Sequence, residues 1–364
     1  MVAVTRTERE AQNPETGFPT AHSKTLFQRI VPEMPRSSFR WLARLGAVAL
    51  VLIVCLVVWG PAMEYPTTVS TSLIEGTNVE VAKSVRDVAG SNIDDAVRWL
   101  QREGAWLFGG LNEAVVFVLI KIEQGLGWIP WPVFVVGIGV LSFAVGRWPL
   151  TLFAVGAMLF MGFMDLWENA IKTVALMTVA VAVSVAIGFP LGVLGARSRM
   201  ADNLMRPILD AMQTMPSFVY LLPAVAFFGL GKSAGIFATV IYAVPPIIRL
   251  TNLGIRQVNP ATVEAARSFG ASPLQILAKV QMPMALPTIM AGINQTTMMA
   301  LAMVTIASLV AAGGLGDNVL RALQKNEYGN GIIAGLAIVF LAIIFDRLTQ
   351  AAARSRQEAL SDGH

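Results

Sequence analysis

Residue types that catalyse reactions or bind metal ions are scarce in this chain. Its one cysteine, Cys55, lies in an apolar run, and its two histidines, His22 and His364, lie near the termini. Metal sites and acid–base centres need clustered Cys, His or carboxylate side chains, and a disulfide framework needs cysteine pairs. We therefore expect no catalytic centre, no metal and no cofactor of the chain's own.

Nucleotide chemistry is also not expected from this chain alone. No G-x-x-x-x-G-K-[ST] phosphate-binding loop occurs in its 364 residues, so ATP hydrolysis would need another protein. The Gly313-Gly-Leu-Gly316 stretch is not such a loop, and we interpret it as a turn at an outer helix end.

Ionisable residues within apolar stretches are few. Asp165, Glu168 and Lys172 stand near the junction of two apolar runs. They could form a proton relay, but a position at the membrane interface is favoured. No row of carboxylates appears in the apolar runs, which argues against an ion-coupled carrier.

Composition places the chain among all-α, polytopic membrane proteins. Hydrophobic residues make up 55% of it and charged residues 14%, and the apolar runs reach the length of membrane spans. We predict about eight transmembrane helices, at 41–59, 131–147, 150–166, 169–195, 218–231, 234–250, 284–311 and 331–348.

The N-terminal part divides into a tail and an anchor. Residues 1–40 are polar and proline-rich, which predicts a disordered tail. Residues 41–60 form an apolar run with Arg29, Arg36 and Arg40 before it and Arg44 near its start, which predicts a membrane anchor helix. A signal peptide is the alternative, but the preceding tail is too long and no A-x-A site follows.

Residues 61–130 differ in character, because acidic residues outnumber basic ones there. The segment 92–124 is typical of an amphipathic helix, and its apolar run 114–120 is too short to span a bilayer. We predict an extracytoplasmic, interfacial helix anchored by tryptophans; a solvated helix packed on the protein is the alternative. The transport domain then covers 131–350, and 351–364 form a second tail.

The basic loops can be assigned to one side of the membrane. With a cytoplasmic N-terminus and eight spans, alternation places Arg147, the loop 197–206, the segment 259–283 and the tail after Arg347 on the cytoplasmic side. This is the distribution that the positive-inside rule requires. We therefore predict an inner-membrane protein with both termini in the cytoplasm.

The segment 259–283 is the longest polar, helix-forming stretch in the apolar second half. Asn259-Pro260 and Ser272-Pro273 each place a capping side chain before a proline at the first helical position. Gln275 completes a capping-box pattern, and Gly270 can adopt the left-handed turn between the helices. The pattern predicts a helix, a sharp turn and a second helix, which we call the elbow.

The elbow also carries a family resemblance. Glu264-Ala265-Ala266, then Gly270, then Val280-Gln281-Met282-Pro283 is similar to the EAA signature of type I ABC importer permeases, with Val280 and Met282 in place of the commoner Ile and Leu. Longer stretches resemble the glycine betaine/L-proline permease family and cover roughly 131–350: 207–231, 243–256, 267–271, 287–295, 313–316 and 346–350.

The resemblance implies a type I ABC importer permease core and a set of partners. Two permease copies would pair with two ATPase subunits that bind the ATP, and an extracytoplasmic binding protein would deliver the osmolyte. Membrane lipid is a further expected partner, and nucleic acid is not. The elbow would be the coupling region, in which Glu264 fixes the elbow by a hydrogen bond or ion pair, Ala265 and Ala266 permit close approach, Gly270 supplies the turn and Pro283 ends the motif.

The resemblance also places the translocation path beside the span that begins near residue 218. A quaternary ammonium cannot donate hydrogen bonds, so aromatic faces are its natural partners. Packing against other helices is the alternative role for each of these residues. The path candidates are Gln213, Thr214, Pro216, Phe218, Tyr220, Phe227 and Phe228.

Three other functions remain open. An ABC permease for choline, carnitine or proline would share every feature above. A channel or ion-coupled carrier would work without an ATPase and would need charges in the membrane. An osmosensing scaffold could act through 61–130 and the basic tail.

Overall fold

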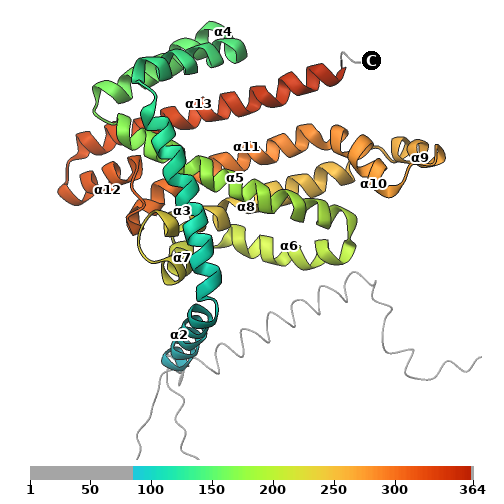
Figure 1. Cartoon of the computed structure of the whole chain (residues 1–364), viewed down its shortest axis with the longest axis horizontal. Coiled ribbons are helices and arrows are strands. Elements are labelled where there is room, and N and C mark those ends of the chain that lie inside the picture. Colours follow the sequence, from blue (N-terminus) through green and yellow to red (C-terminus); the bar gives the residue numbers. More distant parts are fainter. Residues whose placement is uncertain (1–84, 362–364) are drawn as a thin grey trace, which may run out of the picture. The chain divides into compact units, whose positions relative to one another are not determined.

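The computed structural model describes residues 85–361, and every regular element in that part of the chain is a helix (Figure 1). The predicted tail 1–40, the anchor 41–60, residues 61–84 and the last three residues lie outside the described part. Contacts divide the chain after Asn92, and the architecture below concerns the unit that begins at Ile93. The helices are α2 (Val85–Glu103), α3 (Ala105–Trp128), α4 (Trp131–Phe163), α5 (Trp167–Arg197), α6 (Arg199–Thr214), α7 (Leu221–Phe228), α8 (Lys232–Arg256), α9 (Pro260–Ser268), α10 (Pro273–Ile276), α11 (Met282–Ile306), α12 (Leu315–Lys325) and α13 (Tyr328–Ser361).

Most of the membrane spans predicted for the described residues are present, and the predicted total of about eight is not tested because the first span lies outside them. Among the described residues, six helices are long and apolar enough to cross a membrane, or seven if a bent pair is one span. Helices α5, α8, α11 and α13 cover the spans predicted at 169–195, 234–250, 284–311 and 331–348. The anchor at 41–59 falls outside the described part.

Residues 218–231 do not form the continuous membrane helix that was predicted. The chain instead forms α6, a 3-10 turn from Ser217 to Tyr220 and α7, and the two halves meet at 111°. Met215 is extended, with φ −69° and ψ 136°, because the residue before Pro216 is sterically excluded from the helical region. The break at Pro216 lies directly before the predicted span, which begins at 218, and it separates that segment from α6.

Helix α4 is a hairpin, in agreement with the two segments predicted at 131–147 and 150–166. Arg147 breaks it with φ 56° and ψ −157°. A Cβ atom on Gly139 would lie 3.3 Å from Val155, so the halves run beside each other. The ring of Phe134, in the first half, packs against the ring of Trp167, which follows the second half in sequence. Their ring centroids are 5.4 Å apart. Each half is about 24 Å long.

Helix α3 is longer than the apolar run 114–120 suggested. It is a continuous helix of 24 residues, long enough to span a membrane. However, it runs crosswise to α5, α8 and α11 (Figure 1), and both of its ends contact the same end of that bundle. Phe108 stacks on Phe227, and Glu123 pairs with Lys232 at 2.6 Å. The interfacial placement of this region stays a prediction, and the crosswise direction fits it.

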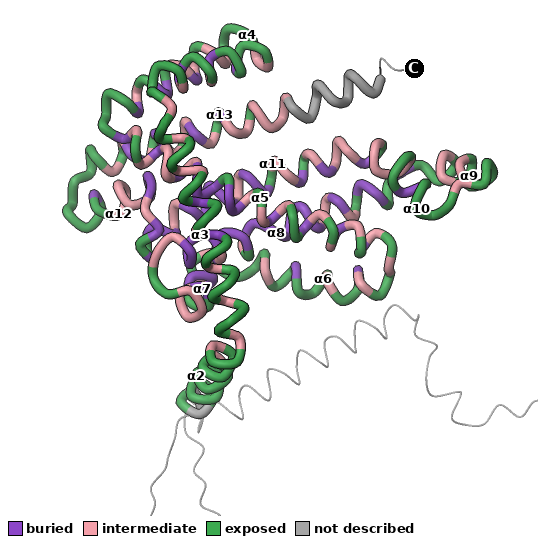
Figure 2. Tube along the Cα trace, in the orientation of Figure 1, coloured by how far each residue is buried: buried purple, intermediate pink, exposed green. Residues whose placement is uncertain are grey.

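The buried core lies where α5, α8 and α11 pack together, as the buried segments in Figure 2 show. Glycines let these helices approach closely: a Cβ atom on Gly192 would lie 2.6 Å from Cβ of Thr251 and 2.8 Å from the Ile248 carbonyl oxygen. Small residues serve the same purpose at helix contacts in membranes generally. This core is the base from which the elbow extends.

The N-terminal end of α5 is tied to α12. Gly313 and Gly314 form the predicted turn, with φ 84° and 81°. The Leu315 amide donates to Oγ1 of Thr173 at 2.8 Å. Nearby, Lys172 and Glu168 form an exposed ion pair at 2.7 Å, which suits an interfacial position better than a proton relay within the bundle.

Candidate functional site

The elbow begins as its sequence predicted. Oδ1 of Asn259 accepts a hydrogen bond from the Ala261 amide at 3.0 Å, and Pro260 occupies the first position of α9. The cap satisfies one amide that has no partner inside the helix, and proline loses nothing there because it has no amide hydrogen. The start of α9 is therefore fixed by local chemistry alone.

The turn and the second helix of the elbow also form as predicted. Gly270 has φ +78°, a conformation that disfavours side chains, and its amide donates to the Arg267 carbonyl at 2.9 Å. Ser272 and Gln275 form a complete capping box: the Ser272 amide donates to Oε1 of Gln275 at 2.8 Å, and the Gln275 amide donates to Oγ of Ser272 at 3.3 Å. The elbow is a capped, well-defined shape.

The elbow projects away from the protein. No residue of α9 is buried, and Glu264, Ala265 and Gly270 are exposed, whereas Ala266 and Pro283 are half-buried. The fixing role of Glu264 stays a prediction: Ser268 donates to its backbone oxygen, and its carboxylate contacts no donor among the described residues. That carboxylate is thus available to another molecule.

Two apolar side chains on the elbow were not singled out from the sequence. Phe269 is 92% exposed and Leu274 is 66% exposed. They flank the Gly270 turn. Leaving large apolar groups in water is unfavourable, and exposed apolar residues next to an unpaired carboxylate are typical of a protein contact surface. The sequence signal that could have identified Phe269 is its position directly before Gly270, a glycine predicted to be left-handed.

The base of the elbow is held firmly. Ile276 and Leu277 are buried, and Leu277 packs with Leu209 of α6 and Ile255 of α8. The chain then passes through a π turn, Leu277–Gln281, directly into α11. The elbow is therefore joined rigidly to α8 at one end and to α11 at the other.

A buried polar cluster reinforces this base. Asp202 of α6 accepts from Arg206 at 2.6 Å and from Asn252 at 2.7 Å, and it pairs with Arg256 at 3.1 Å. Arg256 also donates to the carbonyl oxygen of Gly195 at 2.6 Å. The Asp202 side chain is only 5% exposed. Because Arg256 ends α8 just before the elbow, the cluster joins the ends of α5, α6 and α8.

The predicted path residues do not form one surface in the single chain. Gln213, Thr214, Pro216 and Phe218 are exposed, and Phe218 is 59% exposed. Tyr220 is buried: its hydroxyl donates to the Met212 carbonyl, and its ring meets Tyr242 at 5.9 Å.

The two phenylalanines of α7 are half-buried and stack on other aromatic rings. Phe227 stacks on Phe108 at 4.5 Å between centroids, and Phe228 stacks on Phe237 at 3.7 Å. Of the predicted aromatics, Phe218 is the most exposed, and the path role of these residues stays a prediction. Within the described residues, no group of three or more Cys, His, Asp or Glu side chains could hold a metal ion.

Comparison with known proteins decides the family. The model for binding-protein-dependent transport system inner membrane components matches residues 188–357. The glycine betaine/proline betaine transport system permease protein ProW of Escherichia coli (strain K12) is 44% identical over 262 residues, 72% of this chain and 74% of that protein. The chain belongs to this transport family.

A second relative agrees with this assignment. The glycine betaine/carnitine transport permease protein GbuB of Listeria monocytogenes serotype 1/2a (strain 10403S) is 45% identical over 264 residues, 70% of this chain and 93% of that protein. A structure of the MetNI methionine ABC transporter in an inward-facing conformation overlays on 54% of this chain, with a TM-score of 0.48 and 24% identity.

Membership in the family defines what kind of protein the chain is. Members are inner-membrane transport components, and the described part of this chain has several helices able to span a membrane. It is therefore a multi-pass inner-membrane protein with an all-α permease fold. The matched range 188–357 contains the elbow, the Asp202 cluster and the packed ends of α5, α8 and α11.

Proposed function

We propose that the chain is the membrane subunit of an ATP-driven importer for glycine betaine and related osmoprotectants. A separate ATPase docks on the elbow, a separate binding protein delivers the substrate from outside, and two copies of the chain enclose the path. The observation that carries the proposal is the elbow itself: a doubly capped shape, with no buried residue in α9, rigidly joined to two membrane helices.

The physical basis of coupling is the stiffness of this connection. A movement of a docked ATPase would reach α8 and α11 directly, because Leu277 packs under the elbow and Arg256 joins α8 to α5 and α6. A capped helix loses little conformational entropy on docking, so less of the binding free energy is spent on ordering it. Phe269, Leu274 and Glu264 supply an apolar and acidic contact surface.

The proposed substrate class follows from the similar proteins. ProW is named for glycine betaine and proline betaine, and GbuB for glycine betaine and carnitine. A choline transport permease of Bacillus subtilis is 33% identical over 190 residues. The stronger similarity thus favours glycine betaine over choline as the substrate, and Phe218 offers an exposed aromatic face for a quaternary ammonium.

The proposed orientation places the elbow in the cytoplasm. The Arg147 turn lies beside Arg347 of α13, and Arg256 contacts Gly195 at the end of α5. Basic residues therefore gather at the elbow end of the bundle, as the positive-inside rule requires of the cytoplasmic side. With α3 lying along the outer interface, both termini are cytoplasmic.

Uptake of labelled glycine betaine into proteoliposomes containing the chain, its ATPase and its binding protein tests the proposal. Glu264→Ala with Gly270→Val removes the free carboxylate and the left-handed turn. We expect uptake and substrate-stimulated ATP hydrolysis to fall at least about tenfold, equivalent to ~1.4 kcal/mol. The yield of folded chain should not change, because neither side chain supports the core.

Glu113→Ala with Gly110→Val on α3 is the matched control, because Glu113 is exposed and a Cβ atom at Gly110 meets nothing within 4 Å. It should leave uptake unchanged. Undiminished coupling in the elbow variant would refute the docking role. Competition by unlabelled carnitine, choline or proline ranks the substrates, and uptake without the ATPase would indicate a channel or carrier instead.

A further inference from the structure

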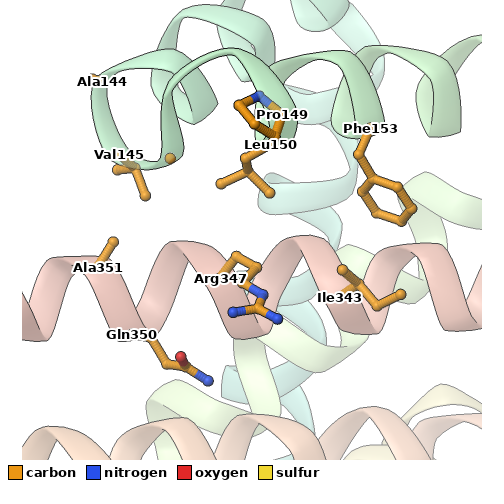
Figure 3. Close-up of a pocket in the computed structure, with 10 residues that line it drawn as sticks. Ala144, Val145, Pro149, Leu150, Phe153, Ile343, Arg347, Gln350 and Ala351 are labelled. Carbon is orange, nitrogen blue, oxygen red and sulfur yellow. The ribbon is translucent and has the colours of Figure 1, made fainter.

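A cavity of about 590 Å³ lies between the hairpin helix α4 and α13, away from the elbow and the path residues. Val145 and Leu150 point from α4 toward α13, and Ile343 and Ala351 point from α13 toward α4 (Figure 3). Ala144, Gly146, Pro149 and Phe153 complete the lining on the α4 side. The two helices thus leave a space that no described side chain fills, lined by apolar side chains and by polar groups that include Gln350.

One cation lines this space. Arg347 lies on α13 between Ile343 and Ala351 (Figure 3). No acidic residue lines the cavity, and Arg347 forms no ion pair or hydrogen bond with the described side chains. The adjacent carboxylate, Asp346, accepts instead from Asn294 at 3.0 Å and from Gln350 at 2.7 Å. The Arg347 side chain is exposed, so its guanidinium has donors free to bind a ligand in the cavity.

The depth of the cavity matches a membrane interface. Each half of α4 is about 24 Å long, close to the ~30 Å thickness of the hydrocarbon layer, so the Arg147 turn reaches one interface. Trp148, which follows this turn, is 66% exposed and meets the ring of Phe143 at 5.2 Å. Exposed tryptophan and arginine residues are typical of the headgroup level.

We propose that this cavity binds one anionic phospholipid. Arg347 holds the phosphate of its headgroup, and an acyl chain lies against Leu150, Phe153 and Ile343. A guanidinium matches phosphate oxygens in geometry and charge, and the apolar walls suit a hydrocarbon chain. A free phosphate ion would satisfy Arg347 but would leave the apolar walls unoccupied, so the combination favours a lipid.

Lipid retention by the full chain tests the site. The chain is reconstituted with equal amounts of phosphatidylglycerol and phosphatidylcholine, extracted in mild detergent and analysed by native mass spectrometry. We expect retained phosphatidylglycerol to exceed phosphatidylcholine, and Arg347→Gln to weaken phosphatidylglycerol binding about fivefold. Ala144→Trp, which fills the cavity from an exposed position, should reduce retention of both lipids.

Arg199→Gln is the matched control, because Arg199 is an exposed, unpaired arginine outside the cavity. It should leave retention unchanged. Equal retention of the two lipids, or equal losses in Arg199→Gln and Arg347→Gln, would overturn the proposal. So would competition by inorganic phosphate alone, which would indicate an ion site. Loss of a dimer in Ala144→Trp would instead assign the cavity to a second copy of the chain.

A photoreactive phosphatidylglycerol with a diazirine on its acyl chain gives a second measurement. Cross-linked peptides should contain Leu150, Phe153 or Ile343 in the unchanged chain, and this labelling should disappear in Ala144→Trp. Labelling spread evenly over the other exposed apolar helices would show ordinary bilayer contact and would contradict a defined site.

Discussion

The packed helices α5, α8 and α11 and the elbow between α8 and α11 achieve a defined shape by different means. In the packed helices, Gly188, Gly192 and Gly292 bring neighbouring backbones close, and the surrounding side chains are buried. In the elbow, α9 has no buried residue, and the shape depends on Asn259, the Gly270 turn and the Ser272 capping box. The first region depends on contacts distant in sequence and the second on local hydrogen bonds.

Because of this difference, we expect the packed helices to determine the stability of the protein and the elbow to determine its coupling to the ATPase. Damage to the packed helices should unfold the protein, because close packing supplies much of the stabilisation of helices in membranes. Damage to the elbow should leave the fold intact and alter only what the elbow contacts, because local segments open with their own, smaller free energies. Variants that violate this division would show that the two regions are energetically connected.

The largest effect on the stability of the protein is expected for Gly192→Val. The new side chain would meet Thr251 and the Ile248 backbone at less than ordinary contact distance, so α5 and α8 must separate. Overpacking of this kind costs ~1–3 kcal/mol. We expect a lower melting temperature of the detergent-purified chain and reduced membrane yield. Gly156→Val is the control, because a Cβ atom there meets nothing within 4 Å, and equal melting temperatures for both variants would contradict the packing role.

Substitutions in the 3-10 turn from Ser217 to Tyr220 are expected to have a smaller effect on stability. In this turn Phe218 is exposed and Tyr220 is buried. Tyr220→Leu removes the hydrogen bond to the Met212 carbonyl and the contact with Tyr242. We expect it to lower the free energy of unfolding by ~1–2 kcal/mol, mainly because the buried carbonyl loses its donor. Denaturation of the purified chain measures this loss.

Phe218→Leu is the exposed counterpart of that variant. It should leave stability unchanged and reduce glycine betaine uptake, since the proposed aromatic face is lost while no buried contact changes. Normal uptake in Phe218→Leu would remove Phe218 from the path, and a stability loss as large as that of Tyr220→Leu would show that Phe218 is a packing residue.

The features that the sequence predicted well are those set by neighbouring residues. The caps at Asn259 and Ser272, the left-handed Gly270 and the Gly313–Gly314 turn all depend on residues within a few positions of each other. Spans such as α5 and α13 were also predicted, because a long apolar run has few alternatives to a helix in a membrane. The predicted boundary between two segments near Arg147 is confirmed by the break in α4.

The features that sequence reasoning missed depend on residues far apart in the chain. The burial of Tyr220 depends on Tyr242, and the packing role of Phe227 depends on Phe108. The Asp202 cluster joins residues of α5, α6 and α8, whose proximity no local pattern encodes. The bend before Pro216 was not predicted, although the proline is a local signal for it.

The smallest effect is expected for Ser272→Ala in the elbow. It removes the Oγ acceptor for the Gln275 amide, which should destabilise the second elbow helix by about 1 kcal/mol. The melting temperature should stay unchanged, because the exposed cap contributes nothing to the packed helices. Amide exchange over residues 272–276 should accelerate about fivefold, and uptake should fall modestly.

Ser272→Asp sharpens this test, because aspartate restores a capping oxygen while changing the side chain and its charge. If local order is what the elbow contributes, Ser272→Asp should recover both the slow amide exchange and the uptake that Ser272→Ala loses. Recovery of exchange without uptake would show that the ATPase contacts the Ser272 side chain itself. A lowered melting temperature in Ser272→Ala would show that the elbow, despite its exposure, supports the packed helices.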